Sequence, residues 1–195
     1  MQLEHKYWYY KNIFPKHLCN EIVSYALSKD LVKGSVVGND KARNDKVRNS
    51  NIVWLDEKWL YIKLINIIRN ANEQANWNFQ VDNAEPVQFT VYKKGMHYDW
   101  HEDAFQKPYS KNNGSLCGKI RKISMSLILN DPKEYKGGEF EIDLGNRQKP
   151  TTTCYEIEEQ GDCIVFPSDL LHKVRPVTHG VRYSLVMWTL GNPFK

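Results

Sequence analysis

The sequence predicts a mainly β protein with N-terminal helices. Two segments with apolar residues at helical spacing lie before residue 76, and short runs rich in β-branched and aromatic residues follow from residue 83 onward. Gly, Pro, Asn and Asp separate these runs. Many short strands at regular spacing favour a sandwich or barrel over a parallel sheet.

The N-terminal part of the chain predicts a strand, a helix, a long loop and a second helix. The aromatic run at residues 7–14 predicts the strand. Pro15 suits the first turn of the first helix, where its missing N–H costs nothing. The apolar residues that follow at helical spacing are Leu18, Ile22, Val23 and Ala26. Residues 30–50 are polar and aperiodic, so we expect a loop there, and residues 56–75 predict the second helix.

Seven β-like runs follow the second helix. They span residues 87–92, 96–101, 123–130, 139–144, 152–157, 162–167 and 172–190, and a turn at residues 176–180 interrupts the last one. We find no internal repeat and no linker. The 195 residues are therefore expected to form one domain, with residues 1–82 as a helical support region and residues 83–195 as the β core.

Charge and cysteine content limit the partners and the cellular compartment that we expect for the protein. The chain carries 27 Lys and Arg residues against 23 Asp and Glu residues, and the small excess is scattered, so nucleic acid is not the expected partner. No apolar run approaches the roughly 20 residues of a membrane span. No secretory signal opens the sequence, and the four cysteines show no CxxC spacing. We therefore expect a cytoplasmic protein with free thiols, and the sequence does not indicate its oligomeric state.

His101 and Asp103 are the first candidate metal ligands. Residues two apart in a strand point to the same face, so an imidazole and a carboxylate lie side by side while Glu102 points away. A third ligand must come from another element. Two histidines and one carboxylate on one face of a metal are typical of non-haem Fe(II) oxygenases.

His172 is the best third ligand, because it begins the last β-like run. If the hairpin is symmetric about residue 177, His172 lies opposite Arg182, and Ser184 shares the face of Arg182. A buried guanidinium needs an anion, and its planar fork matches a carboxylate. A dicarboxylic 2-oxo acid could chelate the metal at one end and meet Arg182 and Ser184 at the other.

Each of these features alone has an ordinary explanation. His172 could be a half-buried histidine, and Arg182 could be an exposed charge on an edge strand. Their joint occurrence with His101 and Asp103 favours the metal site. His97 shares a face with His101 on strand periodicity and is expected beside the ligands or at the surface. Arg48 is expected to be a solvated loop charge rather than a substrate contact.

Three segments resemble the prolyl 4-hydroxylase-like family of 2-oxoglutarate oxygenases. Residues 92–103, YKKGMHYDWHED, resemble that family's YxxGxxYxxHxD segment. Residues 121–139 are similar to its next strand and GGE turn, and residues 161–182 are similar to its C-terminal signature. The most similar branch is the PKHD-type hydroxylases. The resemblance covers roughly residues 85–190, while residues 1–84 share only the order of elements.

The resemblance implies a double-stranded β-helix (jelly-roll) core and a complete cofactor set. It implies Fe(II) on His101, Asp103 and His172, with 2-oxoglutarate and O2 as co-substrates and ascorbate as a further cofactor. It also implies that Arg182 and the Tyr92 hydroxyl bind the distal carboxylate of 2-oxoglutarate. The animal prolyl 4-hydroxylases use Lys in place of Arg182, which weakens the transfer of a collagen-type substrate.

A prolyl residue in a protein or peptide is the first substrate expected from the resemblance. A free amino acid or small metabolite is the second. Nucleic-acid demethylases of the superfamily carry another Arg six positions after the first, and Trp188 occupies that position here. A non-catalytic metal-binding jelly-roll and a cupin-type enzyme without 2-oxoglutarate stay open, as does a purely structural role for Tyr92. The loops at residues 30–50 and 104–120 are candidate lids.

Overall fold

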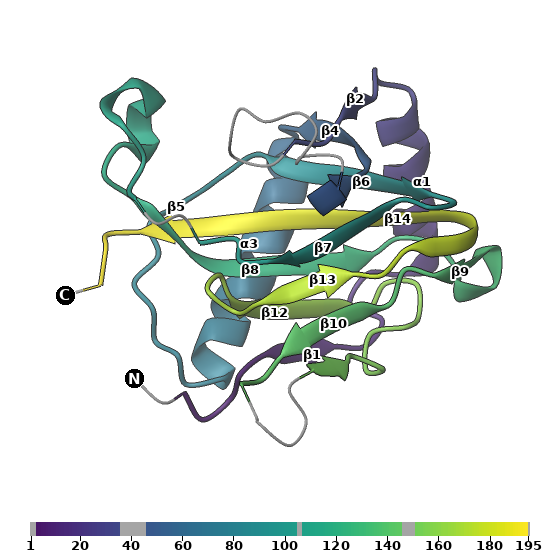
Figure 1. Cartoon of the computed structure of the whole chain (residues 1–195). Helices are drawn as coiled ribbons and strands as arrows, with labels where there is room; N and C mark the ends of the chain where they lie inside the picture. The colour runs from purple at the N-terminus through teal and green to yellow at the C-terminus, as the bar shows by residue number, and fades with distance from the viewer. Residues whose placement is uncertain (1–2, 36–45, 105–106, 146–150, 195) are drawn as a thin grey trace.

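The structure is a computed structural model that describes residues 3–35, 46–104, 107–145 and 151–194 (Figure 1). In this part of the chain two antiparallel sheets pack against each other, and two α-helices cover the other face of the larger sheet. The helices are α1 (Lys16–Leu27) and α3 (Lys58–Gln74), and short 3-10 helices lie at η1 (Lys111–Leu116) and η2 (Pro132–Glu134). Both predicted α-helices are thus confirmed.

The described part of the larger sheet holds nine strands. Its order is β1-β12-β8-β14-β6-β4-β2, and β5 and β9 also pair with β14. The strands are β1 (Trp8–Tyr10), β2 (Val32–Lys33), β4 (Asn51–Leu55), β5 (Asn83–Ala84), β6 (Val87–Lys93), β8 (Ile120–Ile128), β9 (Tyr135–Gly137), β12 (Cys163–Pro167) and β14 (Val177–Gly191). In Figure 1, α3 passes behind the long strand β14.

The described part of the smaller sheet holds five strands in the order β11-β10-β13-β7-β3. They are β3 (Arg48–Asn49), β7 (His97–His101), β10 (Phe140–Asp143), β11 (Thr151–Thr153) and β13 (His172–Val174). All seven predicted β-like runs contain observed strands. The sequence did not predict β4, and within the polar segment 30–50 it did not predict β2 or β3; residues 36–45 of that segment lie outside the described part of the chain. The first 82 residues hold both helices and also contribute strands to the two sheets.

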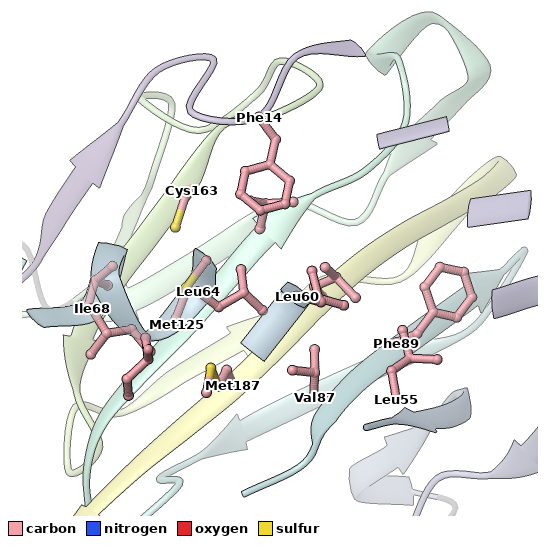
Figure 2. Close-up of a cluster of buried hydrophobic side chains, with 14 of the residues drawn as sticks. Phe14, Leu55, Leu60, Leu64, Ile68, Val87, Phe89, Met125, Cys163 and Met187 are labelled. Atoms are coloured by element: carbon pink, nitrogen blue, oxygen red, sulfur yellow. The ribbon is translucent and has the colours of Figure 1, made fainter. Parts of the chain in front are cut away.

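Alternation along the strands of the larger sheet separates two environments. Residues at alternate positions, such as Phe89, Met125 and Leu185, face α1 and α3 and form the main apolar core (Figure 2). Burial of β12 on both faces explains why this strand is apolar throughout. Cys163 and Val165 face the helices, and Ile164 and Phe166 face the smaller sheet. Among the described helices, none is long and apolar enough to cross a bilayer.

The space between the two sheets is partly polar. Phe140, Ile142 and Val174 of the smaller sheet pack there against Ile128 and Phe166. Several buried polar side chains of the larger sheet alternate with the residues that face the helices, and they therefore point to the same interior: Gln88, Thr90, Ser124, Ser126, Arg182 and Ser184. A polar interior beside an apolar core indicates a binding site between the sheets.

The predicted pairing of His172 with Arg182 is wrong. His172 pairs with His101 on one side and Ile142 on the other, all within the smaller sheet. Arg182 pairs with Tyr92 in the larger sheet. The chain passes from one sheet to the other between β13 and β14, and the start of β14 pairs with β9 instead of β13. The two residues nevertheless face the same interior, from opposite sheets.

Candidate metal centre

Three side chains converge at one end of the smaller sheet. His101 ends β7, Asp103 follows two residues later, and His172 begins β13 directly opposite His101. Asp103 Oδ1 lies 3.7 Å from His101 Nε2, and Asp103 Oδ2 lies 3.6 Å from His172 Nε2. One ligand atom from each residue lies within 4.8 Å of the others. The structure therefore brings together the three residues that the sequence named.

Backbone carbonyls orient both imidazoles. His101 Nδ1 lies 2.7 Å from the Asp99 carbonyl oxygen, and His172 Nδ1 lies 2.8 Å from the Leu170 carbonyl oxygen. A carbonyl only accepts hydrogen bonds, so each Nδ1 carries the proton and donates it. The lone pair of each ring is then on Nε2, the atom that faces Asp103. Such an outer contact fixes the tautomer that a metal-binding histidine needs.

The electrostatics of the site favour ligands without bound protons. Burial and the neighbouring His172 lower the pKa of His101 to about 3, so its imidazole stays neutral. Burial alone would raise the pKa of Asp103, but His172, His101 and Arg121 together lower that pKa to about 2. The neutral imidazole of His101 and the carboxylate of Asp103 carry no proton that a cation must displace near neutral pH. This donor set suits Fe(II) with positions left for other ligands.

Arg182 offers a second charged group to the same interior. Its side chain is 1% exposed, yet its Nε and Nη1 have no hydrogen-bond partner among the described residues. The guanidinium carbon lies 5.8 Å from the centre of the Tyr92 ring. A buried cation with unused donors is costly unless an anion pairs with it. The site therefore fits a dianionic ligand such as 2-oxoglutarate, with one carboxylate at Arg182.

The residues around Arg182 leave room for its guanidinium. Gly138 has a φ of +72°, and a Cβ there would lie 2.8 Å from Arg182 Cδ. Gly137, the last residue of β9, and Gly138 both have positive φ, a conformation that glycine adopts without steric cost. Burial raises the pKa of Tyr92, although Arg48 and Arg182 oppose the rise, so its hydroxyl keeps its proton as a donor. Ser184 is buried two residues beyond Arg182.

A largely buried ion pair that the sequence did not indicate borders the candidate metal ligands. Arg121 donates to Glu85 from Nε at 2.5 Å and from Nη2 at 2.6 Å, and its Nη1 donates to the Asp103 carbonyl oxygen. The guanidinium carbon lies 4.0 Å from the Trp188 ring centre. Tyr109, from the segment named as a lid, donates to Glu85 at 2.7 Å. No local pattern marks these residues, because their contacts join strands and loops far apart in the sequence.

Arg48 is buried, so its prediction as a solvated loop charge is wrong. It is 5% exposed and pairs with Tyr98 across β3 and β7. Its guanidinium carbon lies 4.7 Å from the Tyr98 ring centre, and the Tyr98 ring stacks on His101 with centres 3.4 Å apart. A register shift between β13 and β7 brings Tyr98 to the face of His101. His97 bonds through its ring to the backbone carbonyls of Gly95 and Lys46 in exposed contacts, which agrees with the surface position expected as one alternative.

Comparisons with known proteins agree with this geometry. Residues 87–190 match the family model described as the 2OG-Fe(II) oxygenase superfamily. The chain is 36% identical over 122 residues to a PKHD-type hydroxylase of Sphingopyxis alaskensis, covering 62% of this chain and 50% of the relative. It is 35% identical over 104 residues to a PKHD-type hydroxylase of Janthinobacterium, covering 53% of this chain and 42% of that relative. The matched region thus spans half or less of these curated relatives.

Two solved structures share the fold. A Pseudomonas putida prolyl-4-hydroxylase superposes with a TM-score of 0.72 at 20% identity, covering 95% of this chain and 93% of that one. The viral collagen prolyl hydroxylase from Paramecium Bursaria Chlorella virus-1, in its 2OG complex, gives a TM-score of 0.70 at 20% identity, covering 96% and 97%. The predicted jelly-roll core is confirmed by this likeness and by the two facing sheets.

Proposed function

Because the chain belongs to the 2OG-Fe(II) oxygenase superfamily, we propose that it is an Fe(II)- and 2-oxoglutarate-dependent dioxygenase that hydroxylates a C–H bond. The first candidate substrate is a prolyl residue of a protein or peptide. The observation that carries this proposal is the buried Arg182, whose Nε and Nη1 lack partners among the described residues, in the same interior as His101, Asp103 and His172.

Three residues, His101, Asp103 and His172, would hold the iron, and their surroundings orient them for metal binding. The backbone carbonyls of Asp99 and Leu170 keep Nε2 of both histidines free for a metal, and burial keeps His101 neutral. The carboxylate of Asp103 supplies the negative charge between the two rings. When bound, iron and 2-oxoglutarate supply the oxidant, because decarboxylation of 2-oxoglutarate to succinate and CO2 leaves one atom of O2 for a substrate C–H bond.

Arg182 would bind the distal carboxylate of 2-oxoglutarate. Its Nε and Nη1 form the planar fork that matches a carboxylate in a bidentate pair. The protonated hydroxyl of Tyr92 and the hydroxyl of Ser184 are further donors on the same wall. Tyr135 also borders the guanidinium; burial raises the pKa of Tyr135, and the charge of Arg182 opposes that rise.

Aromatic side chains would keep bulk water from the metal. Phe166 lies edge-on to His172 with ring centres 4.6 Å apart, and the Phe140 ring centre lies 5.4 Å from that of His172. Tyr98 covers the face of His101. These rings leave the ligands only a few exposed atoms, since His172 is 4% exposed and Asp103 is 6% exposed. A dry site strengthens every electrostatic interaction inside it.

The structural neighbours support an amino-acid residue as the substrate. One neighbour is named a prolyl-4-hydroxylase and another a viral collagen prolyl hydroxylase. A third, a Trichoplax adhaerens prolyl hydroxylase with a TM-score of 0.66 at 15% identity, was solved with a peptide fragment of a hypoxia inducible factor. A peptide or protein is therefore the first substrate class to test.

Anaerobic titration of the Fe(II) protein with 2-oxoglutarate tests the proposed chemistry. We expect the weak visible charge-transfer band of an Fe(II)–2-oxoglutarate chelate. The band should vanish in His172→Ala and require far more 2-oxoglutarate in Arg182→Ala, about a hundredfold if two charge-assisted hydrogen bonds are lost. Arg175→Ala is the matched control, because Arg175 is exposed and pairs with Glu141 at 3.4 Å. Folded, iron-loaded protein without the band would overturn the proposal.

A further inference from the structure

Two buried arginines, Arg48 and Arg182, and the half-buried Arg121 lie near the candidate metal ligands, and they differ in their partners. Arg121 is neutralised by Glu85 through two hydrogen bonds. Arg182 has no carboxylate partner among the described residues and is assigned above to 2-oxoglutarate. Arg48 likewise forms no ion pair with a described Asp or Glu, although it is 5% exposed. The counterion of Arg48 is therefore unexplained by the proposed function.

Neutral groups hold the Arg48 guanidinium in place. Its Nε donates to Ser50 Oγ at 3.0 Å, and its Nη1 donates to the Ser35 carbonyl oxygen at 3.2 Å. Tyr98 supports one face of the guanidinium plane. Gly34 makes this placement possible, because a Cβ there would lie 2.8 Å from Arg48 Nε and 2.5 Å from Ser50 Oγ. Nη2 makes no hydrogen bond within the described part of the chain and is the donor left for a ligand.

Arg48 is close enough to the reaction centre to act on a bound molecule. Only the Tyr98 ring separates its guanidinium from His101. The formal charges of Fe(II), Asp103, Arg182 and doubly ionised 2-oxoglutarate cancel, so none of these groups compensates the charge on Arg48. Within the described part of the chain, this buried charge is left for one more anion.

We propose that Arg48 binds a carboxylate of the hydroxylated substrate. This inference rests on the proposed oxygenase function and names the substrate class. The carboxylate would lie within a few bonds of the oxidised carbon, since one aromatic ring separates Arg48 from a metal ligand. Two sources have this chemistry: the α-carboxylate of a free amino acid, and an acidic side chain next to the target residue of a peptide.

Binding of acids and their amides to the anaerobic Fe(II)–2-oxoglutarate protein tests the inference. The probes are free L-amino acids with their carboxamides, and blocked Ala-Pro-Ala peptides in which one neighbour of proline is Asp or Asn. Dissociation constants come from calorimetry and from the shift of the chelate band. We expect at least one acid to bind about tenfold to a hundredfold more tightly than its amide, as for a charge-assisted hydrogen bond. A preference among the free amino acids identifies an α-carboxylate as the ligand of Arg48, and a preference among the peptides identifies an acidic side chain.

Two arginine variants separate this inference from the proposed function. Arg48→Met should lose the preference for acids while binding 2-oxoglutarate within about threefold of the parent. Arg48→Lys keeps the charge and should keep part of the preference, whereas Arg182→Met should lose 2-oxoglutarate binding. Thermal melting confirms that each variant is folded. No preference for acids in the parent protein, or an equal loss of 2-oxoglutarate in Arg48→Met, would overturn the inference. Failure of the parent to bind 2-oxoglutarate would instead overturn the proposed function.

Discussion

His101 and His172 are direct partners across β7 and β13, and each turns its Nδ1 to the backbone carbonyl two residues before it. Both acceptors are backbone carbonyls, so the tautomer of each histidine does not depend on a second side chain. Both Nε2 atoms then face the same carboxylate, that of Asp103. The backbone around the two strands thus sets the tautomer and the direction of both imidazoles.

Substitution of one partner should abolish metal binding without unfolding the protein. We expect His101→Ala to weaken the binding of Fe(II) or Co(II) by more than about a hundredfold, because even loss of an outer contact costs 10–100-fold. His97→Ala is the matched control on the same strand, since the His97 ring bonds only to carbonyls away from the ligands. Metal titration followed by absorption measures both. Equal affinities in the two variants would contradict the assignment of the ligands.

Gly138→Ala should impair 2-oxoglutarate binding more than it impairs folding. The new Cβ would meet Arg182 Cδ at 2.8 Å and Val177 Cγ2 at 3.1 Å, so the guanidinium must shift. Gly95→Ala is the control, because Gly95 also has a positive φ, of +81°, while a Cβ there meets no described atom within 4 Å. Both variants suffer similar backbone strain, of about 1 kcal/mol. Titration with 2-oxoglutarate should show a raised dissociation constant in Gly138→Ala only.

The grouping of His101, Asp103 and His172 could be predicted because strand periodicity and a distant histidine are both visible in the sequence. The match of residues 87–190 confirms the family resemblance that the same motifs suggested. The relation of His172 to Arg182 could not be predicted, because the crossing between sheets depends on pairing of β14 with β9. That pairing joins segments about forty residues apart and leaves no local pattern.

Arg48 shows a second limit of sequence reasoning. Its burial depends on a two-residue strand, β3, within a polar segment that has no periodicity. The face of Tyr98 likewise depends on a register shift in β7. Alternation predicts faces only in regular strands, and irregularities are common near functional sites. The residues that define the walls of the site were therefore harder to predict than the residues at its centre.

The Glu85–Arg121 pair should be strongly coupled. We expect Glu85→Gln to lower the free energy of unfolding by about 3 kcal/mol, because it leaves a buried guanidinium without its carboxylate. Replacement of both residues, Glu85→Leu with Arg121→Met, should restore most of that loss. Asp82→Asn is the control, since the pair of Asp82 with Lys119 is more exposed and contributes about 1 kcal/mol or less. Urea unfolding measures the parent and the three variants, and a double variant no more stable than Glu85→Gln would contradict the coupling.

The cysteines should differ sharply in reactivity. Burial raises the pKa of Cys19 to about 11 and that of Cys154 to about 12, and burial also raises the pKa of Cys163. A raised thiol pKa favours the neutral form, so at about pH 8 these three thiols carry almost no reactive thiolate. Cys117 is exposed. We therefore expect a thiol reagent to label Cys117 alone in the native protein.

Mass spectrometry after a short reaction with iodoacetamide measures this selectivity. Labelling of the native protein should reach one adduct, and labelling in urea should reach four, since all four cysteines are free thiols. Cys117→Ser is the control and should leave the native protein unlabelled. The three buried thiols should stay unlabelled as the pH is raised from about 7 to about 9, because burial raises their pKa values. Rapid native labelling of Cys163 would show that β12 opens to solvent, against its complete burial between α3 and the smaller sheet.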